Sequence, residues 1–578
     1  MVRKARKANV NSYCSLPIVN ELSPIHLTVN TTLLPPKPAD NESPPSSSPI
    51  VNHPNLLEEK KKFVRPSMTH DGSRLNTSVR FQDTKTEGRP SIYLFIFVNP
   101  LSGDCKGKDL IQLPIQHFRL RRFPHVQVEI HNILNEEDRN LGVESIQLVE
   151  QMAKDGQLPS LQDAQEQEDS EAHKISSTVR TRHIHVWSAG GDGTVMSVFE
   201  MLAHHHIDLD YIFFSCIPFG TGNDFSQVLG WGRTIRHSNI LGKRLQHLEE
   251  LITERLEKSE AARLDIWQVE FSAHEGGYVR LAGPQRKDGH DVLEIDEREQ
   301  RGTYPHMVRK MCNYMSIGVQ GYVGSGFEKH RAGNRWMNMG IYTSESAKWV
   351  FWRRFPSVTH FIEKIKYKDQ TVLAVPESDI KDANDTQEGI PKITKRPIDL
   401  VIQNIPHIWG REIDLWGEAK YGLEAVENRS GPTDPANWTP QLANDKKMEV
   451  FTIENMISYI KKLANIRKHV SRIGQFESPF EIVFREPTIL KKQDKKWWQN
   501  WFENKYKQRN VICIMCDGEF YIIKDPKALR FKRFAQIWTL GRFDEHVSGR
   551  LVQDEQVSQQ RQEETQQLYC SSNNKNAQ

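Results

Sequence analysis

The chain contains 578 residues, with 77 lysines and arginines against 74 aspartates and glutamates, and 37% of its residues are hydrophobic. This length predicts two or more domains, because a domain usually contains roughly 100–200 residues. The net charge of only +3 argues against a dedicated nucleic-acid-binding protein, for which a strong basic excess is expected.

Neither a membrane-spanning helix nor a secretory signal is expected. The best apolar run, Ile92 to Val98, has the length of a strand, whereas a spanning helix needs about 20 apolar residues. The basic start of the chain lacks the apolar segment of a signal peptide. Seven cysteines do not form a disulfide framework, and Cys513 and Cys516 lack further zinc ligands, so two thiols buried in a strand are expected. These features favour a reducing, cytoplasmic compartment.

The composition divides the chain into four parts. Residues 1–88 and 551–578 are predicted to be disordered tails, the first rich in proline and serine and the second rich in glutamine and charge. Residues 89–245 form one predicted domain. Residues 258–545 form another.

The first predicted domain contains three apolar strands, each followed by a glycine-bearing loop. The strands cover 92–98, 183–187 and 211–217, and the loops read NPLSGDCKG, SAGGDGT and PFGTGNDFS. After the second loop, apolar residues recur at helical spacing, namely Val195, Val198, Phe199 and Leu202. This pattern predicts an α/β fold with a mostly parallel sheet, whose ligands bind at the carboxyl ends of the strands.

The second predicted domain is mainly antiparallel β. From about Ala262 onward, short alternating segments with turn signals between them read RLDIWQVEF, YMSIGV, IDLVIQNI, FEIVF and VICIMC.

The second loop places one carboxylate among glycines. Gly190, Gly191 and Gly193 would let backbone N–H groups approach a phosphate at the start of a helix. Asp192 would then hold a bridging Mg²⁺ or act as a base beside the transferred phosphoryl group. The alternative for one such loop is a tight turn whose aspartate caps the helix.

The three loops in this order resemble the catalytic domain of diacylglycerol kinases, and the segment Pro218–Asp224 is the most specific of them. Later segments resemble the accessory domain of the same family, including RLDIW, NYMSIGVQGYVGSGFEKHR, YTSES, RIGQ and CDGEF. The resemblance implies a fold related to NAD kinases and phosphofructokinases for residues 89–245. It implies an accessory β domain for residues 258–545. One position departs from the family, where aspartate is common and Gln320 stands here, which puts a metal or substrate role of that position in doubt.

The resemblance also implies site residues. Asp192, Asp517 and Glu519 would serve as base or metal ligands, with Asp192 and Glu519 as the candidate ligands of Mg²⁺. A plain β-hairpin would also explain Asp517 and Glu519. Nucleotide contacts are expected from Asn99, Ser102, Gly103, Gly190, Gly191, Gly193, Thr194, Gly220, Thr221, Gly222, Asn223 and Asp224, although ordinary turn chemistry would account for several of them.

The implied activity is phosphorylation of 1,2-diacylglycerol by ATP and Mg²⁺, giving phosphatidic acid. The alternatives are a sphingoid or ceramide kinase and a catalytically silent lipid-binding scaffold. Because the substrate stays in a bilayer, peripheral contact with the cytoplasmic face of a membrane is expected. The candidate contact segment is Lys495–Lys507, which carries tryptophans and lysines. The competing interpretation is a helix that buries these aromatic residues against the β domain.

Overall fold

The computed structural model describes residues 90–542, except 104, 114–116, 162–174, 177–178, 221, 284–285, 288–289, 292–304, 331–334, 350–354, 377–388, 409–410, 413–415, 417–421, 459–469 and 488–508. Both predicted tails, Thr221 and the segment Lys495–Lys507 therefore lie outside the described residues.

A parallel sheet forms the core of the first half. Its strands lie in the order β3, β1, β4, β5, and β2 pairs antiparallel with β3. The strands are β1 (Ile92–Val98), β2 (His117–Arg119), β3 (Val126–Asn132), β4 (Ile184–Gly190) and β5 (Ile212–Pro218). The three predicted strands are confirmed, and β4 runs three residues further than expected, because Ser188, Ala189 and Gly190 continue the pairing with β5.

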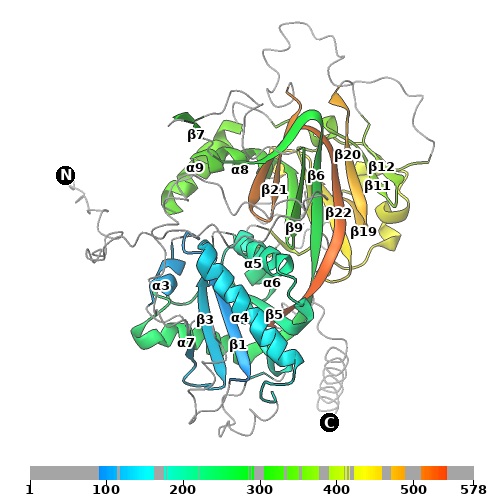
Figure 1. Ribbon diagram of the computed structural model, residues 1–578. Coiled ribbons are helices and arrows are strands. Elements are labelled where there is room, and N and C mark those ends of the chain that lie inside the picture. The colour runs from blue at the N-terminus through cyan, green and yellow to red at the C-terminus, as the bar shows by residue number, and fades with distance from the viewer. Residues whose placement is uncertain are drawn as a thin grey trace, which may run out of the picture. The chain divides into compact units, whose positions relative to one another are not determined.

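Helices cover both faces of this sheet (Figure 1). Alternate residues of β1 point to opposite faces, with Tyr93, Phe95 and Phe97 packing against one pair of helices. That pair is α4 (Glu136–Lys154) and α5 (Asp192–His204), and the predicted apolar face of α5 is buried there. The opposite face packs against α3 (Gly107–Ile111) and α7 (Gln246–Lys258), while the short α6 (Asp224–Val228) follows β5.

The second half is mainly antiparallel, as predicted. One run of paired strands is β19, β18, β14, β10, β21, β22, β6, β9, and another is β12, β11, β20, β22. The bounds are β6 (Ser259–Leu281), β9 (His306–Met311), β10 (Tyr314–Gly318), β11 (Ile362–Tyr367), β12 (Gln370–Ala374), β14 (Asp399–Gln403), β18 (Lys447–Ile453), β19 (Ser471–Glu477), β20 (Phe480–Phe484), β21 (Val511–Cys516) and β22 (Glu519–Arg542).

Shorter elements complete this half. Two-residue strands are β7 (Arg286–Lys287), β8 (His290–Asp291), β13 (Lys392–Ile393), β15 (His407–Ile408), β16 (Arg411–Glu412) and β17 (Val426–Glu427). Two helices, α8 (Val319–His330) and α9 (Arg335–Lys348), follow β10. Cys513 and Cys516 are free buried thiols on β21, which confirms the expectation for the C-x-x-C pair.

Two long strands take part in both hydrophobic cores. Leu264 and Ile266 of β6 belong to the core under α4 and α5, whereas Val269 and Phe271 of the same strand belong to the core of the β half. Its partner β22 pairs with β6 from Tyr521 to Arg542 and also pairs with β5 at Thr539. The β6–β22 pair therefore connects the parallel sheet with the antiparallel one.

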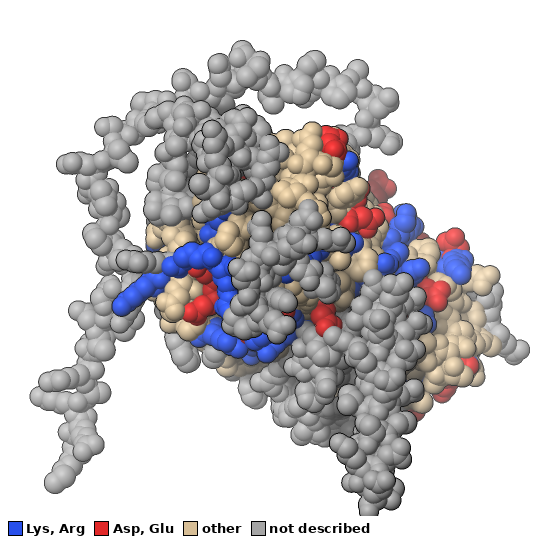
Figure 2. Space-filling model, turned by 90° about the horizontal axis from the view of Figure 1, so that it is seen from below, with Lys and Arg blue, Asp and Glu red and all other residues tan. Residues whose placement is uncertain are grey.

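Charged side chains of both signs lie beside one another on the face drawn in Figure 2. Several surface arginines in the first half pair with carboxylates of α7. Arg121 contacts Glu249 at 2.8 Å, and Arg236 contacts Glu254 at 3.1 Å. Such exposed pairs contribute little to stability, typically about 0–1 kcal/mol.

Candidate active site

The three predicted loops meet at the carboxyl ends of the parallel strands. The Asn99 N–H donates to Ala189 O at 2.9 Å, and the Gly220 N–H donates to Gly190 O at 3.1 Å. The side chain of Asn99 also donates to Thr194 Oγ1 at 3.3 Å, at the start of α5. The loops after β1, β4 and β5 are thus tied together by hydrogen bonds.

Several glycines let these loops pack against one another. A Cβ on Gly103 would lie 2.0 Å from Phe219 O, and a Cβ on Gly220 would lie 2.3 Å from Gly191 Cα. A Cβ on Gly190 would lie 2.2 Å from Thr194 Oγ1. Gly193 differs, because a Cβ there would meet nothing within 4 Å. Loop packing therefore explains Gly103, Gly190 and Gly220 without a ligand, whereas no such contact explains Gly193.

Asp192 is the first residue of α5, but its carboxylate caps the neighbouring helix α6. Its Oδ2 accepts the N–H of Asp224 at 3.0 Å, and its Oδ1 accepts the N–H of Phe225 at 3.0 Å, at the start of α6. The side chain is buried. Burial raises the pKa of Asp192, and the two N–H donors oppose that rise. This carboxylate thus joins the loop after β4 to the loop after β5.

The remaining polar residues of the third loop are also engaged. Asn223 Nδ2 donates to Gly220 O at 2.8 Å and to Arg233 O at 2.9 Å, which fixes the course of the loop. Asp224 is buried at the first position of α6. In the first loop, Ser102 is buried and its carbonyl accepts the N–H of Cys105 at 3.1 Å.

Asp517 occupies the turn between β21 and β22. Asp517 and Gly518 have positive φ values of 45° and 82°, as a two-residue hairpin with paired Cys516 and Glu519 requires. The predicted hairpin is therefore present. The turn also aims the Asp517 carboxylate at the chain between β9 and β10, where the N–H groups of Cys312, Asn313 and Tyr314 donate to it at 2.6, 3.0 and 3.0 Å.

Asp192 and Asp517 come from opposite halves of the fold and lie near each other. Burial is the largest cause that raises the pKa of Asp517 to about 7; the negative charge of Asp192 adds to the rise, and the backbone donors oppose it. The pKa of the Tyr314 hydroxyl is raised by burial and then by the charges of Asp224, Asp192 and Asp517. The Tyr314 hydroxyl donates to Gln320 Oε1 at 3.2 Å, so Gln320 contacts this group of residues.

Glu519 belongs to a different set of contacts. The Tyr521 hydroxyl donates to Glu519 Oε2, and Arg309 Nε donates to the Tyr521 oxygen at 3.0 Å. Sequence reasoning did not single out Arg309, Asn313 or Tyr314. The last two lie within the quoted segment NYMSIGVQ, but their partners are backbone groups and a distant hairpin, which no local pattern reveals.

Two further observations bear on cofactors and membranes. Within the described ranges, no three His, Cys, Asp or Glu side chains converge as a metal site. None of the described helices combines the length and the apolar character that crossing a bilayer requires.

Comparison with known proteins identifies the two halves. Residues 93–252 match the model of the diacylglycerol kinase catalytic domain, and residues 310–493 match that of the diacylglycerol kinase accessory domain. Human "Diacylglycerol kinase theta" is 24% identical over 332 residues, which is 56% of this chain and 26% of that protein.

Two other relatives give similar values. "Probable diacylglycerol kinase 3" of Caenorhabditis elegans is 25% identical over 41% of this chain and 22% of its own length. "Diacylglycerol kinase 4" of Arabidopsis thaliana is 27% identical over 42% of this chain and 45% of its own length. The matches to these relatives therefore span less than half of each relative.

Proposed function

Because the chain belongs to the diacylglycerol kinase family, we propose that it transfers the γ-phosphoryl group of ATP to the hydroxyl of 1,2-diacylglycerol. The observation that carries this proposal is the proximity of two buried carboxylates, Asp192 and Asp517, at the edge where the glycine loops meet. In the reaction, the lipid oxygen forms a bond to the γ-phosphorus, and the bond to the bridging oxygen breaks. ADP leaves, and the hydroxyl proton passes to a carboxylate.

Counting lone pairs supports Asp192 as the base. An ionised carboxylate offers about four acceptor positions. Asp517 already accepts three N–H groups, because Oδ1 accepts from Asn313 and Tyr314 and Oδ2 accepts from Cys312, with the Asn313 N–H also 3.3 Å from Oδ2. Asp192 accepts one N–H on each oxygen and keeps capacity for a proton. Burial also raises the pKa of Asp192, which favours proton uptake by this carboxylate. Asp517 then acts mainly by holding the chain between β9 and β10.

The nucleotide is proposed to bind over the start of α5. Gly193 leaves open space there, and the N–H groups of a first helical turn favour a bound phosphate. Mg²⁺ usually takes only one or two carboxylates together with phosphate oxygens and waters, so the lack of a three-ligand cluster in the described ranges does not conflict with it. With Asp192 assigned as the base, Glu519 is the candidate that would hold it, and the ion would neutralise charge on the phosphates.

Finer features of the proposal concern fold and location. The parallel order of β3, β1, β4 and β5, with loops at one edge, supports an NAD-kinase-like or phosphofructokinase-like fold for residues 89–245. We assign the accessory role to residues 258–545. Since diacylglycerol stays in a bilayer, the protein is proposed to work at the cytoplasmic surface of a membrane.

A lipid panel tests the proposal. The purified full chain is incubated with radiolabelled ATP and mixed micelles of diacylglycerol, sphingosine or ceramide. We expect labelled phosphatidic acid, and we expect Asp192→Asn to lower kcat by about 10²-fold or more, since general-base catalysis contributes about that much. Label on sphingosine or ceramide instead, or on no lipid, contradicts the proposal.

A second aspartate provides a matched control for Asp192→Asn. Asp434 also caps a helical turn, accepting the N–H of Ala436 at 3.0 Å, but it is only half-buried and lies in the β half. Asp434→Asn removes the charge of a similar cap while keeping an oxygen acceptor, and it should leave kcat unchanged. An equal loss of kcat in both variants would mean that Asp192 acts only as a cap.

A further inference from the structure

The short segment Cys312–Tyr314, which leads from the end of β9 to the first residue of β10, is buried. Cys312, Asn313 and Tyr314 are each less than 5% exposed. On one side, Asp517 accepts all three of their N–H groups. On the other side, the carbonyl of Cys312 accepts from Asn404 Nδ2 at 2.6 Å, and the carbonyl of Asn313 accepts from the Asn404 N–H at 2.9 Å. The backbone of this segment is therefore fixed from two directions.

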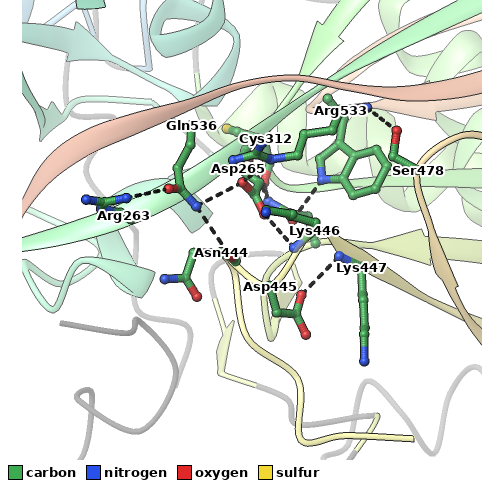
Figure 3. Close-up of polar contacts among 12 residues, drawn as sticks. Arg263, Asp265, Cys312, Asn444, Asp445, Lys446, Lys447, Ser478, Arg533 and Gln536 are labelled. Atoms are coloured by element: carbon green, nitrogen blue, oxygen red, sulfur yellow. Dashed lines mark hydrogen bonds and ion pairs between the residues drawn. The ribbon is translucent and has the colours of Figure 1, made fainter. Parts of the chain in front are cut away.

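Asn404 is itself held in place. Trp267 Nε1 donates to Asn404 Oδ1 at 3.1 Å, and Asn404 Nδ2 also donates to the carbonyl of Asp265 at 3.1 Å. Figure 3 shows Asp265 beside Cys312. The carboxylate of Asp265 accepts hydrogen bonds from Arg533, Gln536 and the Lys446 N–H. Asp265 lies on β6 and Arg533 on β22, so the strands that connect the two sheets support this segment.

The side chain of Asn313 is the exception in this saturated network. Its Oδ1 accepts from Cys312 Sγ at 3.3 Å, but its Nδ2 is buried and has no hydrogen-bond partner among the described residues. Nδ2 lies towards Asp192, whose charged form it favours, without reaching hydrogen-bond geometry. A buried donor left unpaired is costly, and in this structure Nδ2 is open to an acceptor from outside the chain.

We propose that Asn313 is a further catalytic residue, whose Nδ2 donates to an oxygen of the γ-phosphoryl group during transfer. This inference rests on the proposed phosphoryl transfer. The donor lies beside Asp192, which is proposed to receive the proton of the attacking hydroxyl. Because that hydroxyl attacks the γ-phosphorus, an oxygen of the γ-phosphoryl group is the proposed acceptor. A fixed donor aimed at developing negative charge stabilises a transition state more than a mobile one.

The test compares nucleotides that differ by the γ-phosphate. Affinities of the wild type and Asn313→Ala for a non-hydrolysable ATP analogue and for ADP are measured by calorimetry. Hydrogen bonds to charged groups are worth about 1.5–3 kcal/mol, so the variant should bind the analogue about tenfold or more weakly and ADP within about twofold of the wild type. Turnover of diacylglycerol should fall about 10²-fold or more. Asn313→Ser, which keeps a hydroxyl donor, should recover part of both losses.

Two controls separate the possible failures. Asn510 is another buried asparagine, at the opposite end of β21 from Asp517, and Asn510→Ala measures how far a general loss of stability lowers activity. Equal loss of affinity for both nucleotides, or kcat within about fivefold of the wild type in the Ala and Ser variants, would overturn the role of Asn313. A wild type that binds the analogue but phosphorylates no diacylglycerol refutes the proposed function instead, and the affinity comparison still decides the role of Asn313.

Discussion

At the scale of single residues, the glycines of the three loops serve two different purposes. Gly220 lies so close to Gly191 that a side chain would overlap backbone atoms, whereas Gly193 faces open space. Alanine is favoured over glycine by about 1 kcal/mol inside a helix, and Gly193 occupies the first turn of α5. The two glycines therefore make opposite predictions for stability.

We expect Gly193→Ala to keep or raise the melting temperature and to raise the KM for ATP, because the new methyl group occupies the space proposed for phosphate. Gly220→Ala should lower the melting temperature, because the loops after β4 and β5 must separate. Differential scanning calorimetry and ATP titrations check both. An unchanged KM for ATP in Gly193→Ala would remove Gly193 from the nucleotide site.

The sequence indicates Asp192 as a candidate site residue because it follows an apolar strand and lies among glycines. It could not reveal that both oxygens of Asp192 cap α6, because the donors are backbone groups of another loop. The same reason hid the network around Asn313. Its partners, Asp517 and Asn404, are 204 and 91 residues away, as 517 − 313 and 404 − 313 give.

At the scale of elements, β3 combines a buried position with polar residues. All seven residues of β3 are buried, yet Gln127, Glu129 and His131 alternate with valine and isoleucine. His131 lies 3.1 Å from Asp138 on α4 and 3.4 Å from Glu129, and Gln127 donates to Glu129 at 2.9 Å. Burial lowers the pKa of His131, but the hydrogen bonds with Asp138 and Glu129 outweigh it, so the pKa lies above its ordinary value of 6.5.

This raised pKa predicts a pH-dependent contribution to stability. The folded state holds the His131 proton more tightly than the unfolded chain, so the stabilisation is fully present below pH 6.5 and is lost as the pH rises through the folded pKa. The melting temperature of His131→Gln should fall furthest below that of the wild type at acidic pH, and the gap should narrow towards pH 9.

His185 provides the opposite case within the same sheet. Burial lowers its pKa to about 4, so this residue destabilises the fold as the pH falls from about 6.5 to 4. The melting temperature of His185→Gln should therefore rise relative to that of the wild type as the pH falls over that range. Melting temperatures of both variants between pH 4 and 9 decide the matter, and parallel curves for the two would contradict the assigned protonation states.

Elements with a regular apolar pattern could be predicted from the sequence. The structure confirms the predicted strands β1, β4 and β5 and the predicted buried face of α5. The full length of β6 and β22 could not. The predicted strand ended near Phe271, whereas β6 continues to Leu281, and the pairing shifts register between Lys524 and Ala528 and again between Arg533 and Ala535. Each shift breaks the two-residue alternation that identifies a strand.

At the scale of the whole molecule, the strands that connect the two halves also carry part of the candidate site. The β6–β22 pair contributes to both hydrophobic cores, and the Asp517 hairpin opens β22. The hairpin that carries Asp517 is therefore connected by strand pairing, through β22, β5 and β4, to the strand that precedes Asp192.

The segment Lys495–Lys507, outside the described residues, is the proposed point of membrane contact because it contains three tryptophans and four lysines. Attraction to anionic lipids is worth about 1 kcal/mol per basic side chain, and tryptophan favours the bilayer interface. Replacing Trp497, Trp498 and Trp501 with alanine should lower activity on anionic vesicles, increasingly at high salt, and spare activity on detergent-solubilised diacylglycerol. The control is Tyr211→Ala, which changes an exposed aromatic residue immediately before β5, at the edge opposite the loops, and should change neither activity. Equal losses in vesicles and detergent would show that the three tryptophans support the fold and not membrane binding.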